Sequence, residues 1–475
     1  MHEFADWNYT FVFVNNKMNI HFIAIGGSAM HNLAIALHKK GFVVSGSDDE
    51  ILEPSKSRLD ALNLLPEKTG WFPEKITHDL DAVILGMHAR MDNPELIKSQ
   101  QIGLKIYSYP EYIYEQTKEK TRVVIGGSHG KTTITSMILH VLKYHKIECD
   151  YLVGAMLEGF DTMVNLTHGS KIAILEGDEY LASPIDRRSK FHLYKADIGL
   201  ISGIAWDHIN VFPTFENYLE QFRIFAQQIP FGGSLIYCEN DSNVKKIADT
   251  IQKKFIKIPY GVHEYIIHNG TTYLISGKEK IPLKIFGEHN LQNLNGAKFV
   301  CSQLGLGYEK FYEAIQFFKG AAKRLELVES NNSTSVFKDF AHSPSKLKAT
   351  INAVKKQFPE RKLIACMELH TFSSLSEKFL NEYSGAMNEA DEAIVYFNPH
   401  TIEHKKLPQI TDEQVKNAFS PSAFLLNRKE VKVFTNSQKM VDDLKKMNWE
   451  NSNLLMMSSG NFDGVDFKIL ARDIL

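Results

Sequence analysis

The chain has 475 residues, enough for about three domains of ordinary size. Its net charge is −2, so no overall charge favours nucleic acid or a membrane surface as a partner. No apolar run approaches the roughly 20 residues that span a bilayer, and residues 1–17 lack the basic start of a secretory signal. We therefore expect a cytoplasmic protein with no membrane insertion and no nucleic-acid partner, and residues 1–17 as a short extension or an upstream start.

The cysteines exclude two classes of small structural site. Cys149, Cys238, Cys301 and Cys366 stand far apart, and none forms a CxxC pair. A zinc knuckle or a disulfide framework would need closer spacing or more cysteines. We expect four buried apolar thiols in a reducing compartment.

Short apolar runs alternate with helical patterns from residue 20 onward. In the first segment the strand signals are residues 20–25, 42–45, 82–85 and 105–108, and residues 112–120 look like a helix end that links to the next segment. Such alternation predicts parallel sheets covered by helices on both faces.

The alternation of strand and helix signals restarts twice along the chain. The second segment has strand signals at residues 122–125, 172–175, 198–201 and 234–237, short strands with an Asn269-Gly270 turn, and a helix over 290–303. The third has strand signals at residues 335–339, 363–367, 393–397 and 453–457. We predict an α/β protein of three consecutive domains: a Rossmann-like domain (1–119), a central P-loop ATPase domain with a parallel sheet (120–322) and a C-terminal Rossmann-like domain (323–475).

The strongest functional signal is residues 122–133, RVVIGGSHGKTT, where a buried strand leads through a glycine turn into a helix. Backbone N–H groups in such a loop point at phosphate oxygens. Lys131 would reach the outer phosphates and Thr132 would place a hydroxyl on Mg²⁺. Ile125 stands where the longer GxxxxGK[ST] loop has glycine. The predicted ATP-binding residues are Gly127, Ser128, His129, Gly130, Lys131, Thr132 and Thr133.

Carboxylates follow the strand at 172–175, as Glu176-Gly177-Asp178-Glu179. Acidic groups at a strand's carboxyl end lie where α/β sheets bind ligands, and hard oxygen ligands suit Mg²⁺. Ala205-Trp206-Asp207-His208 follows the strand at 198–201 in the same way. Taken alone, these motifs are also compatible with a solvated loop and a capping histidine.

Together these motifs resemble the Mur ligases, whose ATP loop reads G[TS]xGKT[TS] and whose DH motif supplies a histidine to a second Mg²⁺. The resemblance implies Thr132, Glu176 and His208 as metal ligands, and Lys131, Glu176 and His208 as catalytic residues. Many members carry a carbamoylated lysine downstream of DH, whereas residues 218–222 hold no lysine. The branch that takes free UDP-N-acetylmuramate also lacks it.

Three further motifs extend the resemblance. Residues 287–293, GEHNLQN, match GxHNxxN and imply that Asn293 faces adenine. Arg324 stands at the junction to the last domain and is a candidate for the phosphates. Residues 338–344, KDFAHSP, resemble DD[YF]AHxP and imply Asp339 on the ribose and His342 near the nucleotide. Ser343 replaces a second histidine common in the family.

The N-terminal segment resembles the family's UDP-binding domain. Residues 25–30, IGGSAM, resemble the loop that holds the UDP diphosphate. A dinucleotide fingerprint would need its third glycine near Asn32, so NAD is not expected. Ser47-Asp48 and residues 88–90 match further substrate loops. The predicted UDP-substrate residues are Gly26, Gly27, Ser28, Ala29, Met30, Ser47, Asp48, His88, Ala89 and Arg90.

Residues 178–194, DEYLASPIDRRSKFHLY, resemble an insert of the murein peptide ligase branch. Arg187, Arg188 and Lys190 would suit carboxylates of an anionic peptide, although a solvated basic loop is an equal alternative. His370 lies in ELHTF, where the family places its incoming-amine loop. That stretch departs from the branch's usual EPRSNT, so the identity of the amine substrate stays open.

The resemblance implies an ATP- and Mg²⁺-dependent amide ligase that activates the carboxylate of UDP-N-acetylmuramate as an acyl-phosphate. The expected amine is the tripeptide L-Ala-γ-D-Glu-meso-diaminopimelate of peptidoglycan recycling, with L-alanine as the alternative. A folylpolyglutamate synthetase would lack the UDP domain, and a non-catalytic nucleotide-binding regulator would not need Lys131 and Glu176. We expect a monomer or weak homodimer. The base that deprotonates the amine is not evident from sequence, with His129 a weak candidate.

Overall fold

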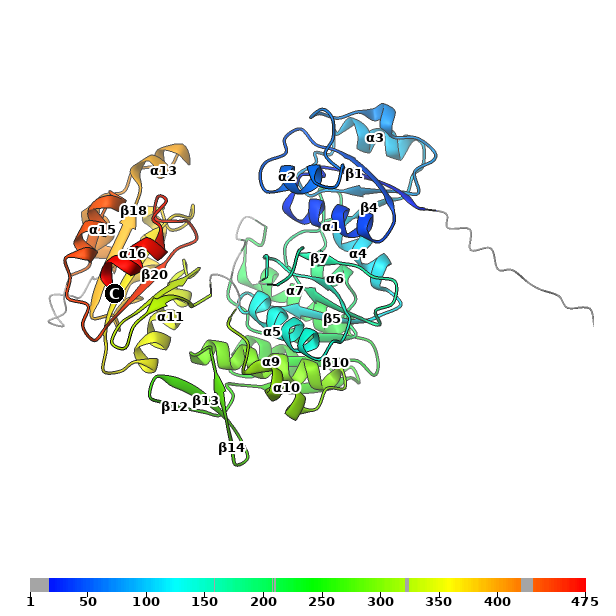
Figure 1. The fold of residues 1–475 in the computed structure, drawn as a ribbon. Helices are drawn as coiled ribbons and strands as arrows, with labels where there is room; N and C mark the ends of the chain where they lie inside the picture. The colour runs from blue at the N-terminus through cyan, green and yellow to red at the C-terminus, as the bar shows by residue number, and fades with distance from the viewer. Residues whose placement is uncertain (1–16, 158, 207, 209–210, 321–323, 420–429) are drawn as a thin grey trace, which may run out of the picture.

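The computed structural model describes residues 17–157, 159–206, 208, 211–320, 324–419 and 430–475. The chain folds into three α/β units that follow one another in sequence (Figure 1). This confirms the predicted fold class. The predicted boundary at 322/323 and nearly all of the predicted 17-residue extension lie outside the described residues. No described helix is long and apolar enough to cross a bilayer.

The N-terminal unit is a four-stranded parallel sheet in the order β2-β1-β3-β4. Its strands are β1 (Asn19–Ile23), β2 (Val43–Ser47), β3 (Ala82–Leu85) and β4 (Ile106–Ser108). Its helices are α1 (Ser28–Lys39), α2 (Ser55–Asp60), η1 (Pro73–Lys75), α3 (Pro94–Gln101) and α4 (Tyr109–Thr117). All four predicted strands are present, within two residues at each end.

The segment predicted to link the first two units is largely helix α4. It begins early because Ser108 and Glu111 form a capping box, which satisfies two N-terminal backbone donors. Tyr112 and Ile113 are buried, and α4 packs against α6 of the next unit. The connection is therefore a packed helix that ties the two units together.

The central unit is built on a seven-stranded sheet in the order β11-β10-β9-β5-β8-β6-β7, parallel except for β7. Its strands are β5 (Thr121–Gly126), β6 (Asp150–Leu152), β7 (Val164–Asn165), β8 (Ile172–Glu176), β9 (Ile198–Ile201), β10 (Ser234–Cys238) and β11 (Ile256–Tyr260). Its helices are α5 (Lys131–Tyr144), α6 (Lys190–Leu193), α7 (Phe215–Gln228), α8 (Ser242–Thr250), α9 (Glu288–Gln303) and α10 (Tyr308–Ile315).

A small antiparallel sheet interrupts this unit, as the sequence predicts. It contains β12 (Tyr265–His268), β13 (Thr271–Ser276) and β14 (Glu279–Leu283). Asn269 and Gly270 both have positive φ between β12 and β13, the geometry of a tight two-residue hairpin turn.

The C-terminal unit has a six-stranded sheet in the order β15-β16-β20-β17-β18-β19, in which β15 is antiparallel. Its strands are β15 (Glu326–Ser330), β16 (Ser335–Asp339), β17 (Lys362–Leu369), β18 (Glu392–Phe397), β19 (Lys432–Phe434) and β20 (Ser452–Met457). Its helices are α11 (Pro344–Gln357), α12 (Glu377–Leu380), η2 (Asn381–Tyr383), α13 (Pro399–His404), α14 (Asp412–Phe419), α15 (Ser437–Lys445) and α16 (Phe467–Ile474).

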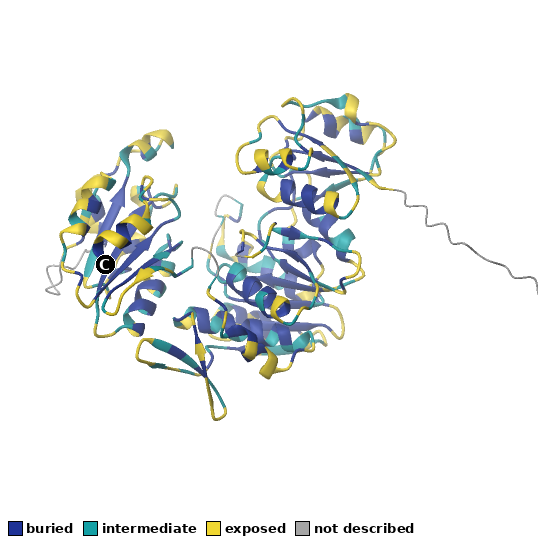
Figure 2. Ribbon diagram, viewed as in Figure 1, coloured by how far each residue is buried: buried dark blue, intermediate teal, exposed yellow. Residues whose placement is uncertain are grey.

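Burial follows the layers in the two larger units. Their central strands are buried over most of their length, while the helices bury one face and expose the other (Figure 2). The near-continuous apolar runs of β8, β9, β17 and β20 reflect helices on both faces of each sheet. Because the parallel strands share a direction, their carboxyl ends meet at one edge, and polar side chains that follow them are brought together there.

Candidate active site

The loop after β5 has the backbone arrangement expected for the predicted anion cradle. It runs from Gly126 into α5, whose N-cap is Gly130 at φ +80°. The first turn of a helix leaves backbone N–H groups without partners inside the helix, and these favour a phosphate. The Ser128 hydroxyl interacts with Tyr218 Oη at 2.8 Å and accepts the backbone N–H of Ala205, so neighbouring segments hold the loop in shape.

Gly130 combines a left-handed backbone with a close contact. A Cβ at this position would lie 2.4 Å from Oδ1 of Asn293, the residue predicted to face adenine. The loop and the start of α9 therefore approach as closely as glycine allows.

Gly130→Ala is expected to weaken both folding and nucleotide binding. A non-glycine residue in this backbone region costs about 1–2 kcal/mol, and displacement of Asn293 adds to that cost. Gly305→Ala is the matched control, since Gly305 has φ +87° and no atom within 4 Å of the added Cβ. We expect a larger fall in melting temperature for Gly130→Ala, with about 10-fold weaker ATP binding that Gly305→Ala does not show. Equal melting shifts with unchanged ATP affinity would contradict the packing role.

Lys131 is anchored at the loop by a buried carboxylate. Its Nζ lies 2.8 Å from Glu179 Oε2 and donates to the carbonyl of Gly127 at 2.6 Å. Burial alone would lower the pKa of Lys131, but Glu179 and Asp178 beside it raise the pKa above its ordinary value. The lysine is therefore held as a cation beside the cradle.

Glu176 and Thr132 meet as the metal prediction requires. The Thr132 hydroxyl donates to Glu176 Oε1 at 2.9 Å, and the backbone N–H of Gly154 donates to Oε2 at 2.8 Å. Burial raises the pKa of Glu176, and the nearby lysine and hydrogen bonds only partly offset that effect. A divalent cation would stabilise the ionised form.

His208 lies near Glu179, the carboxylate that also pairs with Lys131. Its Nε2 is 3.8 Å from Glu179 Oε1, and its ring packs edge-on against Tyr180. Across the described residues, no three His, Cys, Asp or Glu side chains converge on one point as a ready-made ion site. Glu176 beside the Thr132 hydroxyl would suit Mg²⁺, which usually takes one or two protein carboxylates and fills its remaining positions with water and substrate phosphates.

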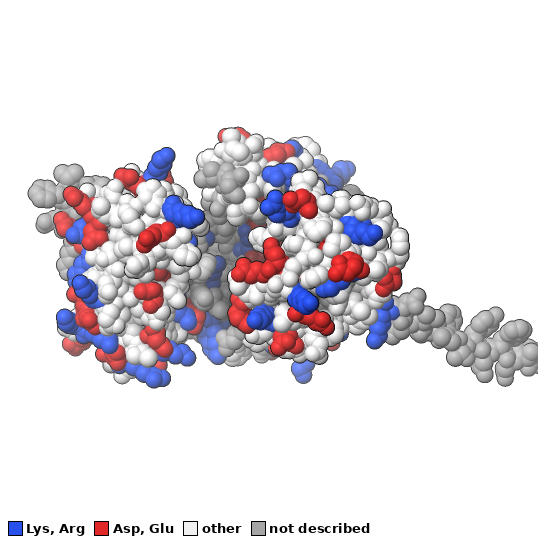
Figure 3. Space-filling view, turned by 90° about the horizontal axis from the view of Figure 1, so that it is seen from above, with Lys and Arg blue, Asp and Glu red and all other residues white. Residues whose placement is uncertain are grey.

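A cavity of about 760 Å³ lies between the central and C-terminal units, in the furrow seen from above in Figure 3. Its lining joins the loop, Glu176 and Asn293 to residues of the last unit. Of the predicted ATP residues, those on the lining are Ser128, His129, Gly130, Lys131, Thr132, Thr133, Asn293, Arg324 and Asp339. Gly127 and His342 are not among the lining residues.

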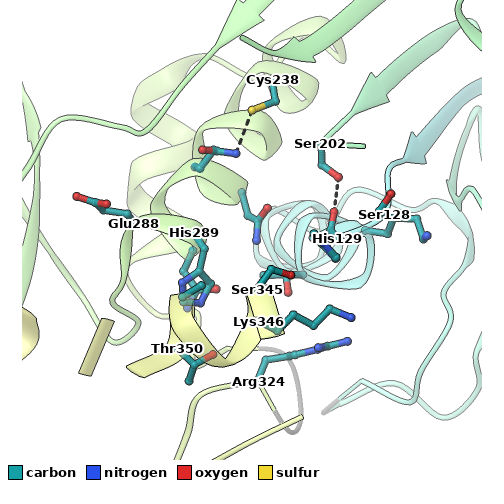
Figure 4. A pocket seen from close by; sticks show the side chains of 18 of the residues that line it. Ser128, His129, Ser202, Cys238, Glu288, His289, Arg324, Ser345, Lys346 and Thr350 are labelled. Carbon is teal, nitrogen blue, oxygen red and sulfur yellow. Dashed lines mark hydrogen bonds between the residues drawn. The ribbon is translucent and has the colours of Figure 1, made fainter. Parts of the chain in front are cut away.

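The C-terminal wall contributes positive charge. In Figure 4 the side chains of Arg324 and Lys346 point toward the same side of the cavity. Arg324 also lies over the Phe340 ring at 5.2 Å. Burial, and next Arg324, lower the pKa of His289 to about 4, so this lining imidazole is neutral. Two cations facing an anion cradle are suited to a polyphosphate.

The predicted ribose ligand also has a local structural role. Asp339 Oδ2 accepts the backbone N–H of Leu325, and Oδ1 accepts that of Ala341. Asp339 thus fixes the chain beside Arg324 at the cavity wall. His342 Nδ1 lies 2.7 Å from the backbone carbonyl oxygen of Phe340, which stands two residues earlier in the chain.

The predicted UDP residues gather at the carboxyl edge of the N-terminal sheet. The glycine loop follows β1, Ser47 ends β2 with Asp48 next to it, and residues 88–90 follow β3. Asp48 accepts the backbone N–H of Gly26 at 2.7 Å, and burial raises its pKa to about 6. Ser28 and Ala29 are exposed at the start of α1, whereas Met30 and Ala89 are buried. His88 is exposed, and Arg90 forms an exposed ion pair with Asp92.

The basic insert is largely engaged within the chain. Arg188 pairs with Asp186 and with Glu111 of α4, and Lys190 Nζ lies 2.6 Å from Asp178 Oδ2. Arg187 is exposed. Burial would raise the pKa of Asp178, but Lys190 and Lys131 together hold it below its usual range. Lys190 thus belongs to the charge cluster around the cradle.

Sequence reasoning missed three contributors. Glu179 was part of the acidic motif, but the motif does not say which carboxylate meets Lys131. Tyr218 Oη is completely buried and bridges Ser128 and Glu179 at 2.8 Å to each. Its position in the stretch that lacks the family's lysine was the available signal. Lys346 follows the Ser343-Pro344 helix start, and only the tertiary fold shows that it faces the cavity.

Comparison with known proteins identifies relatives over most of the chain. Family models match residues 19–121 (Mur ligase family, catalytic domain), 125–301 (Mur ligase middle domain) and 323–460 (Mur ligase, glutamate ligase domain). The UDP-N-acetylmuramate–L-alanine ligase of Caldicellulosiruptor bescii is 32% identical, over 83% of this chain and 86% of its own. That of a Sulfurihydrogenibium species is 31% identical, over 81% and 83%.

Solved structures share the fold. A murein peptide ligase from Psychrobacter arcticus matches with a TM-score of 0.59 at 21% identity, over 96% of this chain and 98% of that one. The UDP-N-acetylmuramate–alanine ligase of Thermotoga maritima matches with a TM-score of 0.66 at 20% identity, over the same shares. A Mur ligase structure with bound ADP matches at 0.59 and 15% identity, over 96% of this chain and 95% of that one. The chain belongs to the Mur ligase family of ATP-dependent ligases, which form carbon–nitrogen bonds in peptidoglycan synthesis.

Proposed function

We propose that this protein joins the carboxylate of UDP-N-acetylmuramate to the amino group of the tripeptide L-Ala-γ-D-Glu-meso-diaminopimelate in the cytoplasm. The observation that carries the proposal is the pairing of Lys131 with Glu179, and of Thr132 with Glu176, beside a cavity that the C-terminal unit lines with Arg324. These groups are suited to transfer of a phosphoryl group to a carboxylate.

The first step is attack of the substrate carboxylate on the γ-phosphorus of ATP. Lys131 and the α5 N-terminus would neutralise negative charge as it spreads over the phosphoryl oxygens, and Arg324 would bind from the opposite wall. Glu179 and Tyr218 keep the lysine and loop in place beforehand, so little reorganisation is needed during the reaction. The products are an acyl-phosphate and ADP.

Thr132 and Glu176 are the groups that would hold Mg²⁺, with His208 a candidate for a second ion. A bound Mg²⁺ would supply Lewis-acid charge to the phosphates. In the second step an uncharged amine attacks the acyl carbonyl and phosphate leaves. The C-terminal unit borders the cavity and would exclude the water that hydrolyses an acyl-phosphate.

The choice of a peptide as the amine rests on the segment between β8 and α6. This segment folds back on itself through a bridge between Leu181 and Ser189 and exposes Ile185 and Arg187. The exposed guanidinium of Arg187 suits a substrate that carries its own carboxylates. L-Alanine is the second candidate, because curated relatives with about 30% identity over most of the chain are L-alanine ligases.

Amine-dependent phosphate release tests the choice. The purified protein receives ATP, Mg²⁺ and UDP-N-acetylmuramate with either the tripeptide or L-alanine. We expect turnover with the tripeptide, and an approximately 10-fold higher KM for it in Arg187→Ala, which is a loss of about 1.4 kcal/mol. Lys278→Ala, an exposed cation on the distant β13–β14 turn, is the control. Turnover with L-alanine alone would establish the second candidate instead.

A further inference from the structure

A second cluster of chemically active side chains lies at the carboxyl edge of the C-terminal sheet. Glu368 is the penultimate residue of strand β17, and its side chain is only 4% exposed. His370 follows two residues later with its side chain 37% exposed. The Nδ1 atom of His370 lies 3.5 Å from Oε1 of Glu368.

The carboxylate of Glu368 is fixed by the loop after β20. Its Oε2 atom accepts hydrogen bonds from the Ser458 hydroxyl and from the backbone N–H of Phe462, the latter at 2.8 Å. The backbone N–H of Gly460 in turn donates to the Ser458 oxygen at 2.6 Å. These contacts occupy Oε2, and Oε1 is the carboxylate oxygen that faces the histidine ring, 3.5 Å from Nδ1.

Gly460 shows how tightly this pair is enclosed. A Cβ at position 460 would lie 2.8 Å from Glu368 Oε2 and 2.8 Å from His370 Nδ1. Only glycine permits the loop to cover both groups at once. The loop covers the Nδ1 side of the imidazole, and the exposed part of His370 is available to solvent or substrate.

The pair lies on the same sheet edge as the cavity wall. β20 lies between β16 and β17, and the backbone N–H of Ser458 donates to the carbonyl of Asp339 at 3.0 Å. Asp339 lines the cavity beside Arg324. Ser458 therefore connects the nucleotide wall to Glu368, which stands two residues before His370.

A histidine with a buried carboxylate next to one ring nitrogen is suited to take a proton on the other. The reaction needs such a group, because an amine is a nucleophile only after its ammonium form has lost a proton. We propose that His370 accepts this proton through Nε2 and that Glu368 is a positioning residue that orients the imidazole. This inference rests on the proposed function.

Amide formation involves the loss of two protons from the incoming ammonium group. The incoming ammonium gives one proton to Nε2 of His370, and the freed lone pair forms the new C–N bond. As the tetrahedral intermediate collapses, the acyl–oxygen bond to phosphate breaks, and the second N–H proton passes to the departing phosphate. The imidazolium then returns its proton to solvent.

The test separates the two half-reactions in the full-length protein. Hydroxylamine is largely uncharged at neutral pH, so it captures the acyl-phosphate as a hydroxamate without a base. We expect His370→Gln to slow amide formation with the amine by about 10²-fold or more, while hydroxamate formation and the KM for the amine stay within about two-fold. Glu368→Gln is expected to act in the same direction with a smaller loss. His400→Gln, 92% exposed on α13, is the control.

Rescue gives a second readout. Added imidazole is expected to restore part of the amide-forming rate in His370→Ala, which a purely structural defect would not show. A parallel loss of hydroxamate and amide would overturn the inference, as would a raised KM with unchanged kcat, since His370 would then bind the amine. If the wild-type protein forms no hydroxamate, the proposed function itself fails.

Discussion

Lys131→Met is expected to lower ATP-dependent phosphate release by about 10³-fold. Lys131 is the cation held at the cradle, and loss of one preorganised charge at a reacting phosphate costs about 10²–10³-fold or more in rate. The measurement is phosphate release with saturating ATP, Mg²⁺ and both substrates. Lys143→Met, at the far end of the same helix, is the control.

The same substitution leaves Glu179 buried without its cation. Breaking a buried ion pair in this way costs about 3–5 kcal/mol of folding free energy, so Lys131→Met alone could lose activity by unfolding. The double variant Lys131→Met/Glu179→Gln removes both charges and is expected to regain most of the stability but none of the activity. Recovery of activity in the double variant would contradict the role assigned to Lys131.

Glu176→Gln is expected to lower activity by about 10²-fold and to raise the Mg²⁺ concentration needed for half-maximal rate. Stability without metal should not fall, because burial raises the pKa of Glu176. A carboxyl group with a raised folded-state pKa weakens the fold as pH rises through that value, and the neutral amide removes this effect. Glu216→Gln on the exposed face of α7 is the control.

Two other results for Glu176→Gln would contradict this account. If Glu176→Gln kept its Mg²⁺ dependence but lost activity, the carboxylate would act on substrate and not on metal. If it unfolded at neutral pH, the Glu176 charge would be a net stabilising group, contrary to the direction of its pKa. Thermal melting with and without a chelator distinguishes these cases.

The sequence was most informative where one local pattern determines both structure and chemistry. The loop at 127–133 has a strand before it and a helix after it, and the structure places it accordingly. The contact between Thr132 and Glu176 follows from two neighbouring parallel strands, β5 and β8, whose carboxyl ends must meet. Both depend on short-range order and the sheet topology.

The sequence was less informative about which charges pair. Arg188 and Lys190 are identical in type to substrate-binding cations, yet one meets Glu111 of another unit and the other meets Asp178. Such partners depend on tertiary packing between segments up to 77 residues apart. The contributions of Tyr218 and Lys346 to the site could not be predicted for the same reason, since neither lies in a motif with a known phosphate contact. The roles assigned to the remaining site residues stay predictions.

Transfer of oxygen from the substrate carboxylate to phosphate tests the central claim most directly. UDP-N-acetylmuramate labelled with oxygen-18 in its carboxylate is incubated with the protein, ATP, Mg²⁺ and the amine, and the released phosphate is analysed by mass. An acyl-phosphate pathway places one labelled oxygen in each phosphate, because the carboxylate oxygen that attacks phosphorus leaves with it. Released phosphate without the label would show that ATP is hydrolysed by water, and the proposed ligation chemistry would be wrong.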